Sequence, residues 1–508
     1  MVRRNVIGLI LVMIMGGLLA LAFGAQAEKE KADDAVFKEC DRFIEILRLV
    51  QKQYVRDVDT KELFKDAIGG MLNGLDPFSN YIPEDEIDEF QKMTRGKFGG
   101  IGIQIGMRQG FLTVISPLEG TPAFEAGIQA GDLILEIDGK SAEGVTLDKA
   151  VKILTGEPGT KVTIKVRHMT GEIAEITMTR AMIEVHTIKG IRRDENDKWV
   201  YLIDPDKKIA YIRVTGFVEN TVPELKEAID GLLKDGVKGL ILDLRFNPGG
   251  ILKSAVDMCD LFLDEGVIVQ TKGRTTPHWE ATATKAGTYP YFPMIVLVNQ
   301  FSASASEIVS GALQDHGRAI VVGDRSFGKG SVQNVIPLEG ERAALKLTTS
   351  KYYMPGGRNI HREEKMTDKD EWGVMPDIAI PMTPEEYIGI IRARQEGEII
   401  RHGNGKKGPE TPEGGAEKPA PQEKTPKPEE KAPKPEEKAP KPGTEMPGID
   451  VPDLNPDGTA PKTPGAKAEA GSRDRQLERA LDLLRGMEVI EKYLKHVPQQ
   501  PAEPKKAA

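Results

Sequence analysis

Hydrophobic residues recur with different spacings along the chain, and each spacing predicts a different kind of structure. Between residues 33 and 95 apolar side chains recur every three or four positions, the repeat of an amphipathic helix. The segment Leu75–Tyr81 interrupts this repeat with an Asp-Pro pair, which favours a turn. We therefore expect an N-terminal helical segment over residues 33–95 that contains at least two helices.

Residues 96–168 have the pattern of a β-rich domain. Short apolar runs are separated by turns that contain glycine or proline, which is typical of short strands. The predicted strands are Ile101–Ile105, Phe111–Ile115, Leu133–Ile137 and Val162–Val166. One helix is predicted at Leu147–Leu154, because Gly156 and Pro158 follow it and both residue types end helices.

Residues 185–390 alternate between strongly apolar runs and amphipathic stretches. The apolar runs predict strands that are buried on both faces of a sheet, and the stretches between them predict helices. The predicted strands are Ile209–Val214, Gly239–Leu244, Met294–Val298 and Ala319–Val322. The predicted helices are Val222–Leu233, Leu252–Leu263 and Ser304–Asp315. We therefore expect an α/β core with a mixed sheet flanked by helices, within a multidomain α/β protein.

The first 27 residues have the features of a targeting segment. Arg3 and Arg4 precede an apolar run, Ile7–Phe23, and the small-x-small sequence Ala25–Ala27 follows it. The run is long for a signal peptide and short for a membrane-spanning helix. We expect export to the periplasm or cell envelope. Residues 1–27 would be removed as a signal peptide, the favoured interpretation, or retained as a membrane anchor.

The C-terminal part of the chain contains a spacer and a last helix. Residues 403–470 are rich in Pro, Lys and Glu, which predicts a disordered, extended linker. Residues 474–494 return to a helical repeat of apolar side chains. A single helix is marginally stable in water, so we expect it to dock on the body of the protein or on a partner, either an adaptor or a second copy.

Composition argues against several classes of function. The net charge of −9, without a basic patch interleaved with aromatic residues, argues against a nucleic-acid partner. Two cysteines do not make a disulfide framework, and Cys259 has apolar neighbours at helical spacing, which places it in a core. The sequence contains no HExxH motif and no paired Cys/His spacing, so neither a metal nor a cofactor is expected.

Two turns that follow predicted strands could carry chemistry. The serine-rich turn Asn299–Glu307 can expose a hydroxyl and present the first amides of a helix to a negatively charged oxygen. Serine-rich turns of this kind are also common helix N-caps. The segment Asp243–Gly250 ends in a glycine pair whose amides could face the same cleft, although the pair alone indicates only a turn.

A lysine between two glycines, Lys329, lies in the segment Gly323–Gln333 and allows three interpretations. A phosphate-binding P-loop would need a serine or threonine where Gly330 stands, and a helix where a strand is predicted. The Ser326-x-x-Lys329 spacing lacks the helical context and companion motifs of a β-lactamase-type site. The third interpretation pairs Lys329 with a serine of the 302–306 turn, since a lysine whose pKa is lowered by burial can replace histidine as a general base.

The order and spacing of these motifs resemble the carboxy-terminal processing peptidases, also called tail-specific proteases. The resemblance is carried by Leu75–Tyr81, Gly99–Gly102, Pro122–Gly139, Asp243–Gly250, Ser302–Glu307, Phe327–Gln333 and Tyr352–Arg358. It implies a serine endopeptidase with Ser304 as nucleophile, Lys329 as general base 25 residues later, and Gln333 positioning the lysine. It also implies an oxyanion hole made by the amide of Ala305 and that of Gly249 or Gly250. The chain departs from the family at Phe78, where histidine is usual.

The same resemblance identifies residues 96–168 as a PDZ-like domain that binds the apolar C-terminal tails of protein substrates. An extended peptide would add to a strand beside the Leu147–Leu154 helix, and successive amides would hold its carboxylate. The expected peptide-binding residues are Gly99, Gly100, Ile101, Gly102, Ile103, Leu147 and Val151. The alternative function is a catalytically silent PDZ scaffold, against which the joint presence of Ser304, Lys329 and Gln333 argues.

Overall fold

The computed structural model describes residues 34–87, 90, 96–108, 110–338, 343–399 and 473–494. The predicted targeting segment (1–27) and the predicted Pro/Lys/Glu spacer (403–470) lie outside the described residues. Residues Met1–Asp76 and Pro77–Ala508 form two compact units. Within the described ranges no helix is both long enough and apolar enough to cross a membrane.

The first unit is helical, as the periodicity predicts. One helix covers residues 34–53 and the next, α2, covers Thr60–Asn73. Asp59 caps α2 because its carboxylate accepts hydrogen bonds from the first free N–H groups of the helix. The predicted helical segment is too long, however. Residues Asn80–Ile82, which belong to the second unit, form strand β1, which pairs with β21 (Ala344–Tyr353) of the same unit.

Six strands of the second unit form the predicted β-rich domain, in the order β3-β4-β5-β7-β8 with β6 beside β5. The strands are β3 (Ile103–Arg108), β4 (Phe111–Pro117), β5 (Leu133–Ile137), β6 (Lys140–Ser141), β7 (Lys161–Arg167) and β8 (Ile173–Thr179). Helix α5 covers Leu147–Leu154 as predicted and contacts β3. Strand β8 was not predicted. It pairs with β7 along its whole length, so the sheet extends beyond residue 168.

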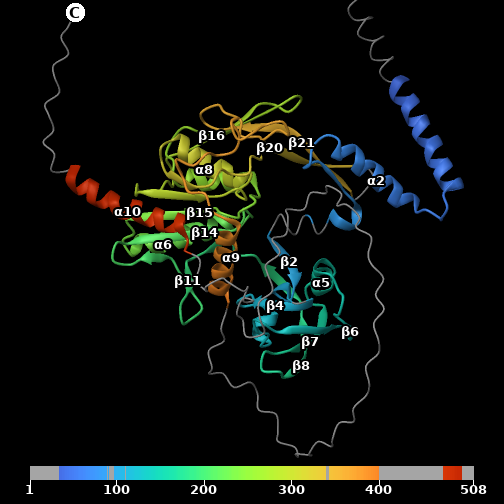
Figure 1. Cartoon of the computed structure of the whole chain (residues 1–508), viewed down its shortest axis with the longest axis horizontal. Helices are drawn as coiled ribbons and strands as arrows, with labels where there is room; N and C mark the ends of the chain where they lie inside the picture. Colours follow the sequence, from blue (N-terminus) through green and yellow to red (C-terminus); the bar gives the residue numbers. More distant parts are fainter. Residues whose placement is uncertain are drawn as a thin grey trace, which may run out of the picture. The chain divides into compact units, whose positions relative to one another are not determined.

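A seven-stranded mixed sheet forms the α/β core (Figure 1). Its order is β10-β14-β15-β18-β19-β22, with β13 beside β14, and the strands from β14 to β22 are parallel. They are β10 (Ile188–Lys189), β13 (Leu202–Asp204), β14 (Ile209–Val214), β15 (Gly239–Asp243), β18 (Met294–Val298), β19 (Ile320–Gly323) and β22 (Ile378–Ala379). The four predicted strands are confirmed at the centre of this sheet, with shifts of one residue at their ends.

Helices cover both faces of this sheet because successive strand residues point to opposite sides. Apolar side chains from one face pack in one cluster with α6, α7 and α8. These helices are α6 (Thr221–Lys234), α7 (Leu252–Asp260) and α8 (Ala305–Asp315). Side chains of the other face, including Ile241 and Ile295, pack against Ala480 and Leu484 of the last helix, α10 (Arg475–Leu494). The predicted C-terminal helix therefore docks on the core of its own chain.

A second sheet of five strands lies beside the core, and the hydrophobic pattern predicted only one of its strands. Its order is β1-β21-β16-β17, with β20 paired to β21. Besides β1, its strands are β16 (Val267–Gly273), β17 (Trp279–Thr282), β20 (Ser331–Pro337) and β21 (Ala344–Tyr353). Strand β1 starts just after Phe78 and β20 starts just after Lys329, so this sheet brings two sequence motifs close together.

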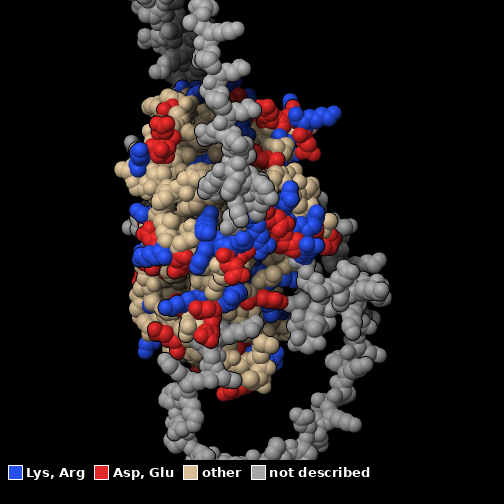
Figure 2. Space-filling view, turned by 90° about the vertical axis from the view of Figure 1, so that its left-hand side faces the viewer, with Lys and Arg blue, Asp and Glu red and all other residues tan. Residues whose placement is uncertain are grey.

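Charged side chains of both signs are mixed on the surface. On the face drawn in Figure 2, Lys and Arg are interspersed with Asp and Glu rather than gathered in one large area. Elsewhere in the described residues, exposed ion pairs include Lys97 with Glu184 and Lys351 with Glu363. Exposed pairs of this kind contribute little to stability, so the fold depends mainly on the two buried faces of the core sheet.

Candidate active site

Ser304 lies at the sharp turn between strand β18 and helix α8. Its backbone has φ 56° and ψ −113°, a conformation that residues other than glycine rarely adopt. Ser304 is the N-cap of α8, so the next amide, that of Ala305, belongs to the first turn, whose N–H groups have no partner within the helix. Strained residues of this kind persist where the surrounding structure holds them, and they gather at functional sites.

The other two serines of this turn donate their hydroxyls to the backbone. Ser302 Oγ donates to the carbonyl of Leu244 over 2.8 Å, and Ser306 Oγ donates to that of Asn247 over 2.9 Å. Both serines are completely buried, whereas Ser304 is partly exposed. Ser304 is therefore the most accessible of the three serines.

A buried carboxylate, that of Glu307, joins the serine turn to the lysine loop. One of its oxygens, Oε2, accepts the backbone N–H of Ser304 and that of Lys329, each over 2.8 Å. The other, Oε1, accepts the N–H of Gly328 over 2.7 Å and the hydroxyl of Ser326 over 2.5 Å. Burial raises the pKa of Glu307, and these hydrogen bonds oppose that rise because they favour the ionised form.

The contacts of Ser326 and the structure after Lys329 bear on two of the three interpretations of the lysine segment. The Ser326 hydroxyl is fully buried, and it also accepts the N–H of Val374 over 2.6 Å. It is therefore occupied from both sides, which disfavours the Ser326-x-x-Lys329 interpretation. The residues after Lys329 form strand β20 and not the helix that a P-loop requires.

Lys329 extends toward Phe78 from a tightly packed loop. Its Nζ lies 4.6 Å from the centre of the Phe78 ring, and its carbonyl accepts a hydrogen bond from the Tyr352 hydroxyl. Gly330 is required beside it, because a Cβ at this position would lie 2.5 Å from the backbone nitrogen of His361. Close backbone approach thus explains why a glycine follows the lysine.

Gln333 lies on β20, four residues after the lysine. Its amide nitrogen donates to Ser331 Oγ over 2.9 Å and to Thr348 Oγ1 over 3.1 Å. The N–H of Thr348 in turn donates to Ser79 Oγ over 3.0 Å. Gln333 is therefore tied to the same second sheet that carries the residues next to Phe78.

The turn that ends in Gly249 and Gly250 packs directly against Ser304. The Asn247 side chain is completely buried, donates to the carbonyl of Val214 and accepts the N–H of Gly249, both over 2.9 Å. A Cβ on Gly249, whose φ is +100°, would lie 2.8 Å from Ser304 Cβ. The absence of a side chain at Gly249 therefore allows this turn to approach the serine.

Two residues that organise the site, Glu307 and Asn247, were not given a functional role from the sequence. A signal for Glu307 was present, since Ser304-x-x-Glu307 has the spacing of a capping box. Asn247 stands immediately before Pro248 and the glycine pair. No local pattern in the sequence indicates that its side chain would be buried between Val214 and Gly249.

The predicted peptide-binding residues fall into two groups in the structure. Ile103 begins β3, and Leu147 and Val151 are 37% and 39% exposed on the neighbouring helix α5. Gly99 and Gly100 instead belong to β2 (Lys97–Gly100), which pairs with β9 (Ala181–Glu184). The side chain of Ile101 is buried in the domain core, and Gly102 adopts φ +77° just before β3.

Parts of the chain match known protein families. Residues 208–380 match the model of Peptidase family S41, residues 89–167 match the PDZ domain, and residues 21–86 match the activating protease CtpB N-terminal domain. The carboxy-terminal-processing protease of Bartonella bacilliformis is 38% identical over 423 residues, which cover 82% of this chain and 92% of that protein. The carboxy-terminal processing protease CtpA of Bacillus subtilis is 33% identical over 327 residues, 64% of this chain and 67% of that protein.

Among solved structures, a photosystem II D1 C-terminal processing protease aligns with 67% of this chain and 88% of its own, at 27% identity and a TM-score of 0.38. The assignment rests on the sequence relatives. The match to Peptidase family S41, together with the PDZ domain, places this chain in the class of serine-type peptidases. The chain belongs to the carboxy-terminal processing protease family within that class.

Proposed function

We propose that this protein is an exported endopeptidase that selects protein substrates by their C-terminal tails and cleaves them with Ser304 as nucleophile and Lys329 as general base. The observation that carries the proposal is the single oxygen of Glu307 that accepts the N–H groups of both residues, each over 2.8 Å. Their main chains are thereby held together although 25 residues separate them. The engaged hydroxyls of Ser302, Ser306 and Ser326 support the same choice of nucleophile.

The proposed reaction is acyl transfer to water. A neutral Lys329 amine takes the proton of the Ser304 hydroxyl while Oγ bonds to the substrate carbonyl carbon and the carbonyl electrons move to the oxygen. When this oxyanion collapses, the peptide nitrogen leaves with the proton from Lys329, and an acyl-enzyme remains. Water then attacks the ester and gives its proton to Lys329, which returns it to Ser304 as the acid product departs.

The amides of Ala305 and Gly250 are the proposed donors to the oxyanion. The N–H of Gly249 already donates to the Asn247 side chain. Gly250 forms a parallel β-bridge with Phe217. The N–H of Phe217 donates to the carbonyl of Gly249, and the N–H of Ile251 donates to the carbonyl of Phe217. In such a bridge the N–H of the central residue points to the opposite side, so that of Gly250 is directed away from Phe217.

Gln333 is proposed to position the lysine through its carbonyl oxygen. Its amide nitrogen carries two hydrogens, and both are donated, one to Ser331 and one to Thr348. Only Oε1 is left to accept a hydrogen bond from the Lys329 amine. Gln333 would therefore orient the base without itself exchanging a proton.

The PDZ domain is proposed to bind substrate tails in the groove between β3 and α5. A peptide that adds to β3 as a further strand would place its alternate side chains over the exposed Leu147 and Val151. Apolar tails fit because these two side chains are apolar. The relatives named carboxy-terminal processing proteases support a role of this kind for the present chain.

Initial rates of cleavage of an unfolded protein substrate test the proposal. Ser304→Ala and Lys329→Ala should each abolish turnover, and Lys329→Arg should be equally inactive, because a guanidinium stays protonated and cannot accept a proton. The double variant should be little worse than either single one, since the two residues act as one unit. Full activity in Ser304→Ala or in Lys329→Arg would refute the mechanism, and no turnover by the parent protein would favour a silent PDZ scaffold.

A further inference from the structure

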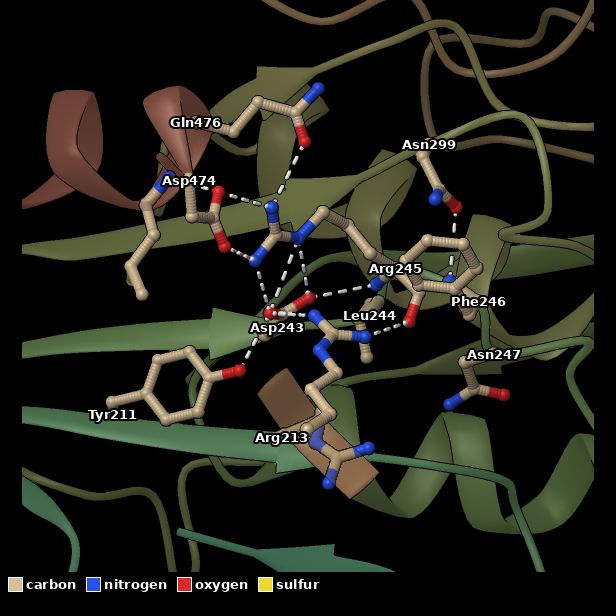
Figure 3. Close-up of polar contacts among 12 residues, drawn as sticks. Tyr211, Arg213, Asp243, Leu244, Arg245, Phe246, Asn247, Asn299, Asp474 and Gln476 are labelled. Carbon is tan, nitrogen blue, oxygen red and sulfur yellow. Dashed lines mark hydrogen bonds and ion pairs between the residues drawn. The ribbon is translucent and has the colours of Figure 1, made fainter. Parts of the chain in front are cut away.

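Polar side chains at the start of helix α10 and just before it contact Arg245 and Asp324, which belong to the segments that lead to the candidate active site. The apolar face of the helix buries Ala480 and Leu484 against the core sheet. Figure 3 shows a second set of contacts, in which Asp474 and Gln476 point toward Arg245. Arg245 is only 2% exposed and lies two residues before Asn247, in the turn that ends in the glycine pair.

Asp474 completes a buried cluster of charges. The Arg245 guanidinium donates to both oxygens of Asp474 over 2.8 Å and to Asp243 Oδ2 over 2.8 Å. Asp243 also accepts the Tyr211 hydroxyl over 2.7 Å and the Arg394 guanidinium over 2.5 Å. Although burial alone would raise the pKa of Asp243, the two guanidinium groups hold it well below its usual range. The cluster thus contains two guanidinium groups, those of Arg245 and Arg394, and two carboxylates. One carboxylate, that of Asp474, comes from the C-terminal segment.

Gln476 connects Arg245 to the segment that carries the lysine. Its side chain is completely buried, and its Oε1 accepts a hydrogen bond from Arg245 over 3.1 Å. Its Nε2 donates to Asp324 Oδ2 over 3.2 Å and to the carbonyl of Ile380 over 2.9 Å. Asp324 directly follows β19 and starts the segment that runs through Ser326 to Lys329.

The turn after Arg245 is strained, so it needs external support. Phe246 adopts φ 64°, a conformation that costs an aromatic residue free energy. Its N–H donates to the Asn299 side chain over 3.0 Å, and its ring stacks on Phe301. Loss of the contacts at Arg245 would release one end of this turn, and the turn carries the amide that is proposed to bind the oxyanion.

We propose that Asp474 and Gln476 are positioning residues of the peptidase. Docking of α10 holds the segments Asp243–Gly250 and Asp324–Lys329 in the arrangement that catalysis needs. This inference rests on the proposed function, because it assigns a task to a helix that does not contact the nucleophile. The segment that carries these two residues is joined to the core through residues 400–472 of the same chain, which keeps the helix at a high local concentration.

Substitutions in the full-length protein test the kinetic consequence. We expect the double variant Asp474→Asn and Gln476→Ala to lower kcat on an unfolded protein substrate at least tenfold with less than a twofold change in KM. Asp482→Asn is the matched control, because Asp482 is exposed on the same helix, and it should keep the parental kcat. Circular dichroism should show that each protein is folded at the assay temperature. Parental kcat in the double variant would overturn the proposal.

Amide hydrogen exchange tests the arrangement without relying on activity. In a Ser304→Ala background, the double variant should exchange at least fivefold faster in peptides covering 243–250 and 324–329, and peptides from β14 and β18 should be unchanged. The Asp482→Asn control should match the parent. Equal exchange in the two segments would overturn the inference even if the enzyme is a protease, and faster exchange would support it even if Ser304 is not the nucleophile.

A peptide added in trans separates positioning from a loss of folding. Leu484→Glu places a charge in the apolar contact and should detach the helix, with a fall in kcat like that of the double variant. A synthetic peptide of residues 473–494 should restore at least half of the activity, and the same peptide with Asp474→Asn and Gln476→Ala should restore less than a tenth. Equal rescue by the two peptides would show that only apolar docking matters and would overturn the roles of Asp474 and Gln476.

Discussion

Glu307 illustrates how one buried side chain can organise groups that are distant in sequence. Its two oxygens accept four donors, three of them backbone N–H groups from the serine turn and the lysine loop. An ionised carboxylate without a cationic partner is costly to bury, and hydrogen bonds to its charged form offset that cost. The four hydrogen bonds thus offset part of the free-energy cost of burying the Glu307 carboxylate.

We predict that Glu307→Gln lowers kcat by about tenfold to a hundredfold, because a displacement of about 1 Å in an active site has effects of this size. Glutamine retains one acceptor oxygen and directs an NH₂ group toward groups that are themselves donors. KM should change little, since Glu307 is completely buried. Initial rates measure this effect, and Glu265→Gln, at an exposed position, is the control. Unchanged kcat in Glu307→Gln would contradict the positioning role.

A second prediction concerns the glycine after the lysine. Gly330→Ala should destabilise the fold by about 1–3 kcal/mol and reduce activity, because the new methyl group would meet the backbone of His361. Gly231→Ala is the matched control: Gly231 lies inside α6 with open space around it, so alanine should stabilise the protein by up to about 1 kcal/mol. Urea unfolding midpoints compare the two variants, and equal midpoints would contradict the packing argument.

The sequence was informative about which residue types the site contains and less so about their supports. Ser304 and Lys329 were selected through the resemblance to the carboxy-terminal processing peptidases, and the structure brings their backbones to one carboxylate oxygen. The role of Glu307 depends on a loop 21 residues away, and that of Asn247 depends on a strand that precedes it by 33 residues. Such long-range contacts have no local pattern, so periodicity and propensity cannot predict them.

At the scale of elements, the central parallel strands were predictable and the second sheet was not. Strands β14, β15 and β18 are covered on both faces, and so their sequences are continuous apolar runs. Strand β21 has mostly half-buried residues, and β17 is mostly exposed, so neither has a strong apolar signal. Burial on both faces therefore made the core strands predictable from their apolar runs. Partial exposure weakened that pattern in most strands of the second sheet, which carries Gln333.

The element-scale prediction concerns the groove between β3 and α5. Val151→Asp should raise KM at least fivefold for a substrate with an apolar, free C-terminal tail, because a carboxylate would face apolar side chains and the tail's own charge. The same substrate with an amidated tail should already be cleaved slowly by the parent. Lys149→Asp, an exposed change of charge on the same helix, is the control. Equal rates with free and amidated tails would exclude tail recognition and leave the protease assignment intact.

At the scale of the whole molecule, the proposed location outside the cytoplasm depends on residues 1–27. We predict that the mature native protein begins near Glu28, because the small-x-small sequence Ala25–Ala27 ends there. N-terminal sequencing of the purified protein measures this. Ala27→Asp should block the cleavage and leave the longer chain. An intact Met1 on the wild-type protein in a cytoplasmic fraction would contradict export.

The placement of α10 also affects the order in which the protein can mature during synthesis. The last central strand, β19, ends at Gly323, whereas Leu484 of the helix that covers the second face of the sheet lies about 160 residues later in the chain. At roughly 5–20 residues per second, a ribosome needs on the order of 8–30 s to cover that distance. During this interval Ile241 and Ile295 lack their covering helix and Arg245 lacks Asp474. If Asp474 and Gln476 position the site as proposed, a nascent chain therefore contains Ser304 and Lys329 before the residues that support their segments have been synthesised.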